Sequence, residues 1–272
     1  MKVRFSQWAV SAVAALALLG STLTLAGEKE DNEANKRSAV QRVADAHDEV
    51  LITGAARLIL KQASIHIARG LLTEWGKSDG LGKNWKPGVA EWDAAERVLL
   101  DNATISPLER VAAGAWVKDI RTEYVANTFD GESADTIATH LESKSGKAQL
   151  ALMDWFMGEM TLFNYTYTGR FQYDLKGAEA ELKALQKAAQ PRIPKKDNEL
   201  EFSTLNPEAF QFVACSPESR YCPGVRYARL NAIAVQGAII RYIDAVGSEV
   251  QAAMRGMRGD VQPMLDAFKA KG

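Results

Sequence analysis

The stretch 50-VLITGAARLILKQASIHIARGLLTEW-75 contains no proline and repeats its apolar residues with the period of an α-helix. The pattern begins near Asn35, and its positions spaced by seven are Ala44, Leu51, Leu58, Ile65 and Leu72. Apolar residues at this spacing form one face of a helix, which must pack against a partner. The pattern predicts one long amphipathic helix over residues 35–75, or two helices separated by a bend near Thr53-Gly54.

A second long helix is predicted over residues 225–257. Its apolar face consists of Leu230, Ile233, Ile240, Ile243, Val250, Met254 and Met257. Gly237 and Gly247 lie on or beside this face, where we expect them to let a partner helix approach closely. The two long helices predict a mainly α fold, a multi-helix bundle in a single domain over residues 27–272.

Shorter helices are expected over residues 89–102, 107–128, 130–145, 147–163, 177–190 and 260–271. The clearest local signal is Ser106-Pro107-Leu108-Glu109, which has the residues of a capping box at a helix start. Gly146 is a plausible C-terminal cap. Residues 191–205, with two prolines at the start, form a possible linker.

Residues 163–175 depart from the helical period, because bulky residues alternate on both sides of Thr168-Gly169-Arg170. This alternation predicts a short β-hairpin, and the alternative is a helix that continues into an aromatic loop. The segment belongs to the densest aromatic group of the chain, and an exposed platform of such rings could bind a glycan or a small molecule. Core packing is the competing explanation. The candidate ligand-binding residues are Trp155, Tyr165, Tyr167, Phe171 and Tyr173.

Residues 1–26 have the pattern of a signal peptide. Lys2 and Arg4 precede an apolar run over residues 9–19, and small residues end at Gly27. The alternative is a retained membrane anchor, but the run is short and acidic residues follow it. We therefore expect a periplasmic or secreted protein with no transmembrane anchor after cleavage. Without residues 1–26 the net charge is −3, and the chain lacks the basic surface that nucleic-acid binding requires.

The two cysteines, Cys215 and Cys222, stand seven residues apart in a loop with Pro217, Pro223 and Gly224. They are too few for a zinc site and lack the Cys-x-x-Cys spacing of a redox pair. Because disulfides persist in exported proteins, the sequence predicts a disulfide here, which would fix the start of the second long helix.

Few residues suggest catalysis or metal binding. The three histidines, His47, His66 and His140, form no helical ligand pair, so we expect no metal and no cofactor. His47 lies on an apolar face and is interpreted as a core residue, whereas Asp45, Asp48 and Glu49 are interpreted as solvated surface. No hydrolase signature occurs. Whether the protein is an enzyme stays uncertain, with the pattern leaning against it.

Two resemblances to known families bear on function. Glu142-Ser143, followed by Gly146, Gln149 and Met153, is similar to elements of lytic transglycosylases, although more tightly spaced. A second resemblance covers residues 75–165. It rests on Trp75-Gly76, 84-NWKPG-88, Trp92, Ala95 and the runs 134-ADTI-137 and 141-LESKSGK-147, which resemble an uncharacterised domain of exported bacterial proteins. This second resemblance implies an all-helical exported fold without known catalytic residues.

The expected function is a non-catalytic accessory or interaction role in the cell envelope, with an envelope protein or a glycan as possible partner. The alternatives are glycan or small-molecule binding through the aromatic residues, and a glycan-acting hydrolase or lyase. The last would need two carboxylates facing each other across a cleft.

Overall fold

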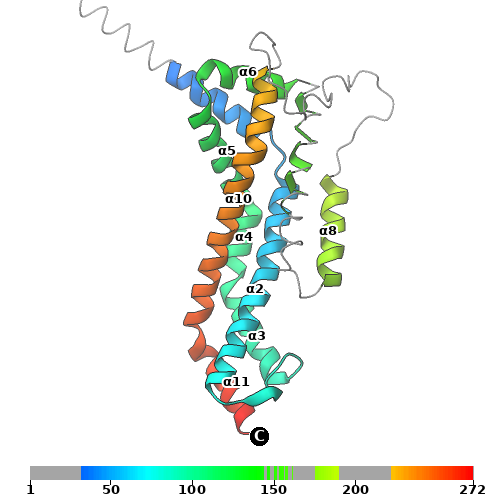
Figure 1. Ribbon diagram of the computed structural model, residues 1–272, viewed down its shortest axis with the longest axis vertical. Coiled ribbons are helices and arrows are strands. Elements are labelled where there is room, and N and C mark those ends of the chain that lie inside the picture. Colours follow the sequence, from blue (N-terminus) through cyan, green and yellow to red (C-terminus); the bar gives the residue numbers. More distant parts are fainter. Residues whose placement is uncertain are drawn as a thin grey trace, which may run out of the picture.

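The computed structural model describes residues 32–143, 175–189 and 222–271, together with separate positions between 146 and 161, and shows an elongated helical bundle (Figure 1). The first helix covers residues 32–45. The labelled helices are α2 (Val50–Ser78), α3 (Ala90–Ala103), α4 (Ile105–Ala113), α5 (Ala115–Thr128), α6 (Gly131–Glu142), α8 (Leu175–Ala189), α10 (Cys222–Gly256) and α11 (Arg258–Lys269), with the short 3-10 helix η1 (Gly82–Asn84) between α2 and α3. No strand occurs among these residues, which confirms the predicted mainly α bundle.

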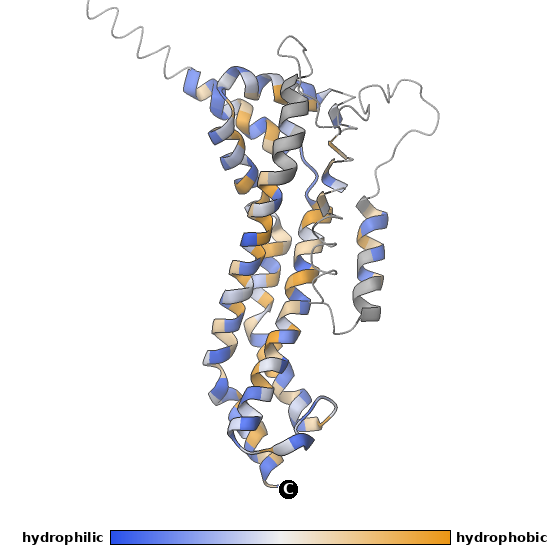
Figure 2. Cartoon of the chain, in the orientation of Figure 1, coloured by the Kyte–Doolittle hydropathy of each residue, from blue (hydrophilic) through white to orange (hydrophobic). Residues whose placement is uncertain are grey.

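The two long helices form the spine, as the sequence predicts. Helices α2 and α10 run side by side along the long axis, and α3 and α4 pack against α2 (Figure 1). Helix α11 packs on α3 at the lower end, whereas α5 and α6 pack on α10 toward the upper end. Helix α8 lies on the outer side of α2. Apolar residues of the spine face the interior, while hydrophilic residues face outward (Figure 2).

The first predicted long helix is broken, but not where the sequence suggested. Residues 46–49 are non-helical and separate the 32–45 helix from α2, whereas Thr53 and Gly54 lie inside α2. Val50, the first residue of α2, is 52% exposed.

The predicted helix over residues 107–128 is wrong in its boundaries, because Gly114 divides it into α4 and α5. Gly114 has φ 75°, a left-handed conformation that glycine adopts without steric cost and that often ends a helix. Ser106 is already helical and does not cap the helix, since α4 begins at Ile105. Gly146 is likewise helical rather than a cap, and Ser143 ends α6.

The buried apolar residues form two separate cores. The lower core joins α2, α3, α4, the first turn of α5, α10 and α11, and includes Ile52, Leu60, Leu72, Trp75, Trp85, Trp92, Trp116, Val117, Met157, Ile239 and Val250. The upper core joins the 32–45 helix, α6 and the neighbouring ends of α5 and α10, and includes Val40, Val43, Val125, Phe129, Ile137, Leu141, Leu150, Met153 and Tyr227. The upper core is the smaller and contains no tryptophan among the described residues.

Helix α2 is long and apolar enough to cross a membrane by length and composition alone. Of its most apolar window, however, 56% is buried inside the molecule. That burial is what a core helix of a bundle shows.

Several sequence predictions fall outside the described residues. They are the signal peptide at 1–26, the hairpin over 163–174 and the linker at 191–205. Leu175, where the expected hairpin ends, is the first residue of α8. The assignment of residues 27–272 to a single domain stays a prediction.

We predict that Gly76→Ala destabilises the lower core. A Cβ at this position would lie 2.2 Å from Cδ1 of Trp85, whose Nε1 donates to the Leu72 carbonyl at 2.8 Å and holds the ring in place. The cost of such overpacking is about 1–3 kcal/mol in the free energy of unfolding, measured by urea denaturation. Gly70→Ala, in open space on the same helix, should instead be neutral or stabilising. Equal effects of the two substitutions would contradict the packing.

Candidate functional site

Five polar side chains meet in the interior at the level where the two cores adjoin. They come from the break between the first two helices (His47, Glu49), from α5 (Arg121), from the helical segment that contains Asp154, and from α10 (Tyr227). We call this group the polar layer. Its side chains are almost completely enclosed: His47 and Arg121 are 0% exposed, Asp154 5% and Glu49 10%.

Hydrogen bonds fix the ring of His47 from both sides. Its Nδ1 lies 2.6 Å from Oδ1 of Asp154, and its Nε2 lies 2.5 Å from the Tyr227 hydroxyl. A carboxylate can only accept, so Nδ1 carries a proton and donates it to Asp154. In the neutral ring Nε2 is then an acceptor, and the Tyr227 hydroxyl donates to it.

Arg121 connects the rest of the layer. Its Nε donates to Oε1 of Glu49 at 2.7 Å, and its Nη2 donates to Oε2 of Glu49 at 3.3 Å and to Oδ1 of Asp154 at 3.2 Å. It also hydrogen-bonds the Tyr227 oxygen. A guanidinium presents several donors in one plane, and here two carboxylates and a hydroxyl accept them.

The layer also satisfies the backbone at the break. A helix interruption frees N–H groups that must find other acceptors when buried. Oδ2 of Asp154 accepts from the Asp48 N–H at 3.0 Å, and the Asp48 carboxylate accepts from the Val50 N–H at 3.1 Å. The Asp154 carboxylate therefore holds both the His47 side chain and the chain that carries it.

The protonation states follow from burial and the neighbouring charges. Burial lowers the pKa of His47, the Arg121 cation lowers it further, and Asp154 opposes both effects only in part. Burial raises the pKa of Tyr227 despite the nearby Arg121 cation. Burial alone would lower the pKa of Arg121, but Glu49 and Asp154 raise it. The layer thus contains a neutral imidazole, a neutral phenol and a charged guanidinium.

The order Asp154–His47–Tyr227 resembles the carboxylate–imidazole–hydroxyl relay of hydrolases. Nucleophilic catalysis would require a hydroxyl that a substrate can reach and that loses its proton readily. Tyr227 is only 1% exposed, and its raised pKa keeps the phenol protonated. The layer therefore serves to hold helices together rather than to attack a substrate.

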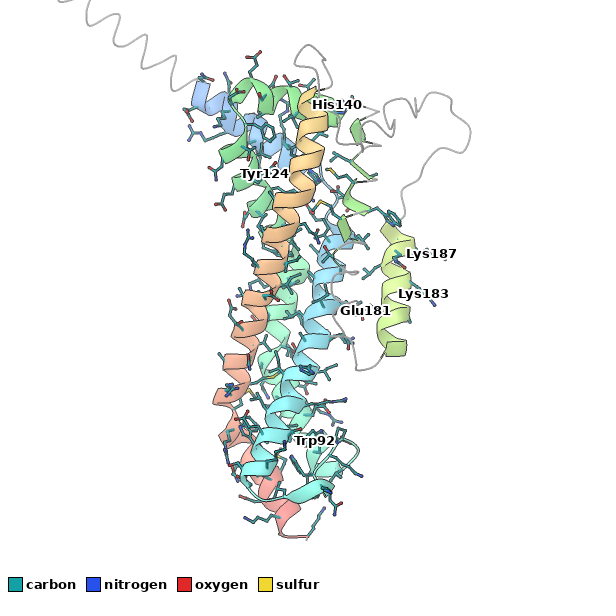
Figure 3. All side chains as sticks on the ribbon, in the orientation of Figure 1. Trp92, Tyr124, His140, Glu181, Lys183 and Lys187 are labelled. Carbon is teal, nitrogen blue, oxygen red and sulfur yellow. The ribbon has the colours of Figure 1, made fainter. Side chains whose placement is uncertain are left out.

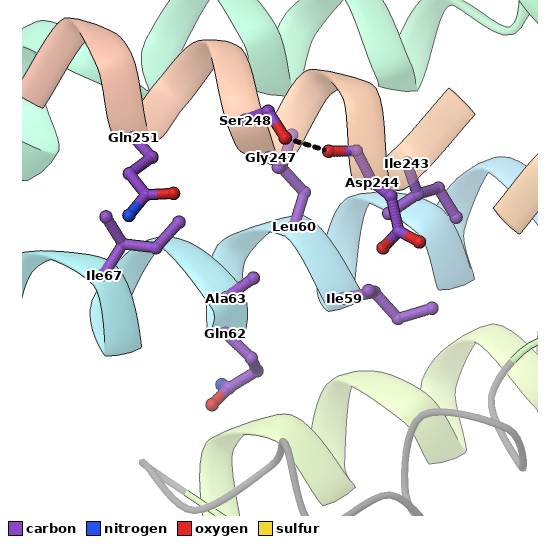
Figure 4. A pocket seen from close by; sticks show the side chains of 10 residues that line it. All are labelled: Ile59, Leu60, Gln62, Ala63, Ile67, Ile243, Asp244, Gly247, Ser248 and Gln251. Atoms are coloured by element: carbon purple, nitrogen blue, oxygen red, sulfur yellow. Dashed lines mark hydrogen bonds between the residues drawn. The ribbon is translucent and has the colours of Figure 1, made fainter. Parts of the chain in front are cut away.

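A surface groove lies elsewhere, between α2 and α10, and has a volume of about 280 Å³ (Figure 4). Half of its lining residues are aliphatic, and Leu60 and Ile67 of α2 point toward α10. Asp244 is the one ionisable residue in its lining. The lining residues are Ile59, Leu60, Gln62, Ala63, Ile67, Ile243, Asp244, Gly247, Ser248 and Gln251.

Two of the lining residues are Gly247 and Gln62. Gly247 was expected to allow close helix approach, but a Cβ there would meet no heavy atom within 4 Å, so its missing side chain leaves the groove open. Gln62 is 2% exposed and extends from α2 toward α8, on the side away from α10 (Figure 4). Its Oε1 has no hydrogen-bond partner among the described residues. A buried acceptor without a donor costs stability.

The aromatic residues proposed from sequence are only partly described. Trp155 belongs to the segment beside the polar layer and is half-buried, whereas Tyr165, Tyr167, Phe171 and Tyr173 lie outside the described residues. Cys215 also lies outside them, and Cys222 is the first residue of α10, with its side chain not described.

Glu142, suggested by the resemblance to lytic transglycosylases, forms an ion pair with Arg42 at 2.7 Å. The hydrogen bond from Arg42 lowers the pKa of this carboxyl, which is the opposite of what a general acid requires. Among the described residues no group of three or more His, Cys, Asp and Glu is arranged to hold a metal ion. His140 lies at the upper end of the molecule, on α6 (Figure 3).

The polar layer was not predicted, because Glu49 was interpreted as solvated surface and His47 as a core residue. The signal that could have revealed it is Arg121, which lies one helical turn from Val117 and from Val125, both fully buried. A charged residue in the middle of an apolar stripe predicts a buried ion pair.

We predict that Arg121→Met lowers the free energy of unfolding by about 3–5 kcal/mol, because Glu49 and Asp154 would remain buried without their cation. Urea denaturation at neutral pH measures the change. Arg110→Met is the matched control, since Arg110 pairs with Glu249 on the surface and both side chains are more than half exposed. That control should change stability by less than about 1 kcal/mol. A mild effect of Arg121→Met would mean that the layer is not a coupled unit.

A comparison of the chain with protein families, curated sequences and solved structures found no match.

Proposed function

We propose that the chain is an exported, non-catalytic interaction protein of the bacterial envelope, which binds a helix of a partner protein in the groove between α2 and α10. The observation that carries the proposal is the chemistry of the groove. Half of its lining residues are aliphatic, and a single lining residue is ionisable.

The size and openness of the groove favour a protein partner. Small-molecule sites are usually concave pockets of about 300–1,000 Å³ that bury most of the ligand. This groove, at about 280 Å³, has room for a few side chains and runs along two helices. An amphipathic helix binds such a groove by laying its apolar residues between the two walls.

The ionisable residue of the groove indicates which kind of partner side chain binds there. Asp244 is the ionisable residue of the lining, and its carboxylate can accept N–H groups. The stem of a lysine or arginine can lie along the aliphatic side chains of α2 while its N–H groups approach this carboxylate. We therefore propose a partner helix with aliphatic residues and one basic side chain.

Absence of opposed carboxylates in the groove supports a binding role over glycan cleavage. Glycoside hydrolysis in its usual form needs two carboxyl groups across a cleft, and the described lining contains one.

Site-specific photo-crosslinking in intact cells tests the partner. A photoreactive residue in place of Gln251, at the groove, should form an adduct with one envelope protein. The same residue in place of Glu249 should not, because positions two apart on a helix face different sides. Asp244→Asn should reduce the Gln251 adduct at least threefold, because the basic side chain of the partner loses its opposite charge. Adducts of equal yield at both positions, or a Gln251 adduct insensitive to Asp244→Asn, would refute the groove as the binding site.

Export and the disulfide are proposed from the sequence and are tested together. Protein recovered from the periplasm should begin near Gly27 when its N-terminus is sequenced. Cys215 and Cys222 should resist alkylation until a reductant is added, since a disulfide between them would persist in that compartment. The same chain produced without residues 1–26 in the cytoplasm is the control, and its thiols should react at once. An uncleaved N-terminus, or thiols that react in both preparations, would contradict these proposals.

A further inference from the structure

The polar layer separates the two cores along several elements at once. On α5, Arg121 stands between Val117 of the lower core and Val125 of the upper core. In the segment of Asp154, Met153 belongs to the upper core and Met157 to the lower one. The chain break at 46–49 lies at the same level. A polar cross-section therefore divides the long bundle.

The hydrogen bonds of the polar layer fit the neutral form of His47 and not the protonated form. Ionisable groups from four parts of the chain face the imidazole. They are Asp48 and Glu49 of its own segment, Arg121 of α5, Asp154 of the segment between α6 and α8, and Tyr227 of α10. The Tyr227 oxygen accepts from Arg121 while its proton goes to Nε2 of the ring. If Nε2 gains a proton, two N–H donors face this oxygen, and the described contacts supply no second acceptor for the phenol proton.

We infer that the polar layer is an acid-sensitive hinge, in which protonation of His47 opens the upper core while the lower core stays folded. This regulatory device does not depend on the proposed partner or on the groove.

We expect the upper core, rather than the lower core, to open when His47 is protonated. It is smaller than the lower core, and the 32–45 helix continues into α2 only through non-helical residues. Beyond its apolar face, this helix is tied to α6 by Arg42, which pairs with Asp135 and Glu142 at 2.7 Å each, at the surface. Exposed ion pairs contribute little stability. Opening would leave the tryptophan-rich lower core intact.

The size of the effect follows from proton linkage. An opened His47 titrates near its ordinary pKa of about 6.5, whereas the closed layer keeps it neutral at lower pH. A pKa that is depressed in the closed state gives stability that is fully present above 6.5 and is lost as pH falls below it. Between pH 7.5 and 5.0 the open fraction should therefore rise by up to about 30-fold.

Hydrogen exchange measured by mass spectrometry at pH 7.5 and 5.0, corrected for the intrinsic pH dependence of exchange, tests the hinge. Protection of the 32–45 helix and α6 should fall by up to about 30-fold at pH 5.0, while α3 and α11 keep their protection. His47→Gln should remove this difference, and His66→Gln, an exposed histidine on α2, should leave it unchanged.

The wild-type profile decides the matter even if His47→Gln does not fold. Equal loss of protection in both cores at pH 5.0, or no loss in either, would overturn the hinge. A folded His47→Gln variant that keeps the acid response would assign it to another group and would also overturn the proposal.

Discussion

The fully buried guanidinium of Arg121 is the constraint on which the arrangement of this bundle depends. A cation without access to water is tolerated only when paired charges and hydrogen bonds surround it. Glu49 and Asp154 supply the charges, and Tyr227 supplies a further oxygen. These residues come from four parts of the chain, up to 178 positions apart, counted from Glu49 to Tyr227. Satisfying one side chain therefore fixes four elements relative to each other.

The ionisable groups and the surface groove lie in different parts of the molecule. Ionisable groups converge in the interior, where no substrate can reach them, whereas the groove on the surface combines aliphatic and uncharged polar side chains with a single carboxylate. In enzymes, titratable groups with shifted pKa usually line a cleft. Here a group of that kind lies at the joint of two cores, which favours a mechanical role for it. The groove, with an open position at Gly247, is the surface that we propose for recognition.

Sequence patterns predicted what depends on periodicity. Helices α3, α10 and α11 begin and end within three residues of the expected positions, because apolar residues repeat along one face of each. The helix end at Gly114 was not predicted, because the sequence pattern around a glycine does not show whether its φ is negative or positive. The composition of the polar layer could not be predicted from sequence. Arg121 indicates that a buried carboxylate pairs with it, but the sequence does not show which carboxylates these are. Only the packing of helices distant in the chain selects Glu49 and Asp154.

The position of the chain break has a physical reason that local patterns do not contain. In a continuous helix residues two apart point in nearly opposite directions, so His47 and Glu49 could not both reach the interior. Leaving the helical conformation at residues 46–49 lets both side chains face Arg121 and Asp154. The frayed backbone is then held by Asp154, which accepts the Asp48 N–H. Apolar residues at these positions would have favoured an uninterrupted helix from residue 32 to Ser78, so the buried charges determine that the bundle has a joint at this level.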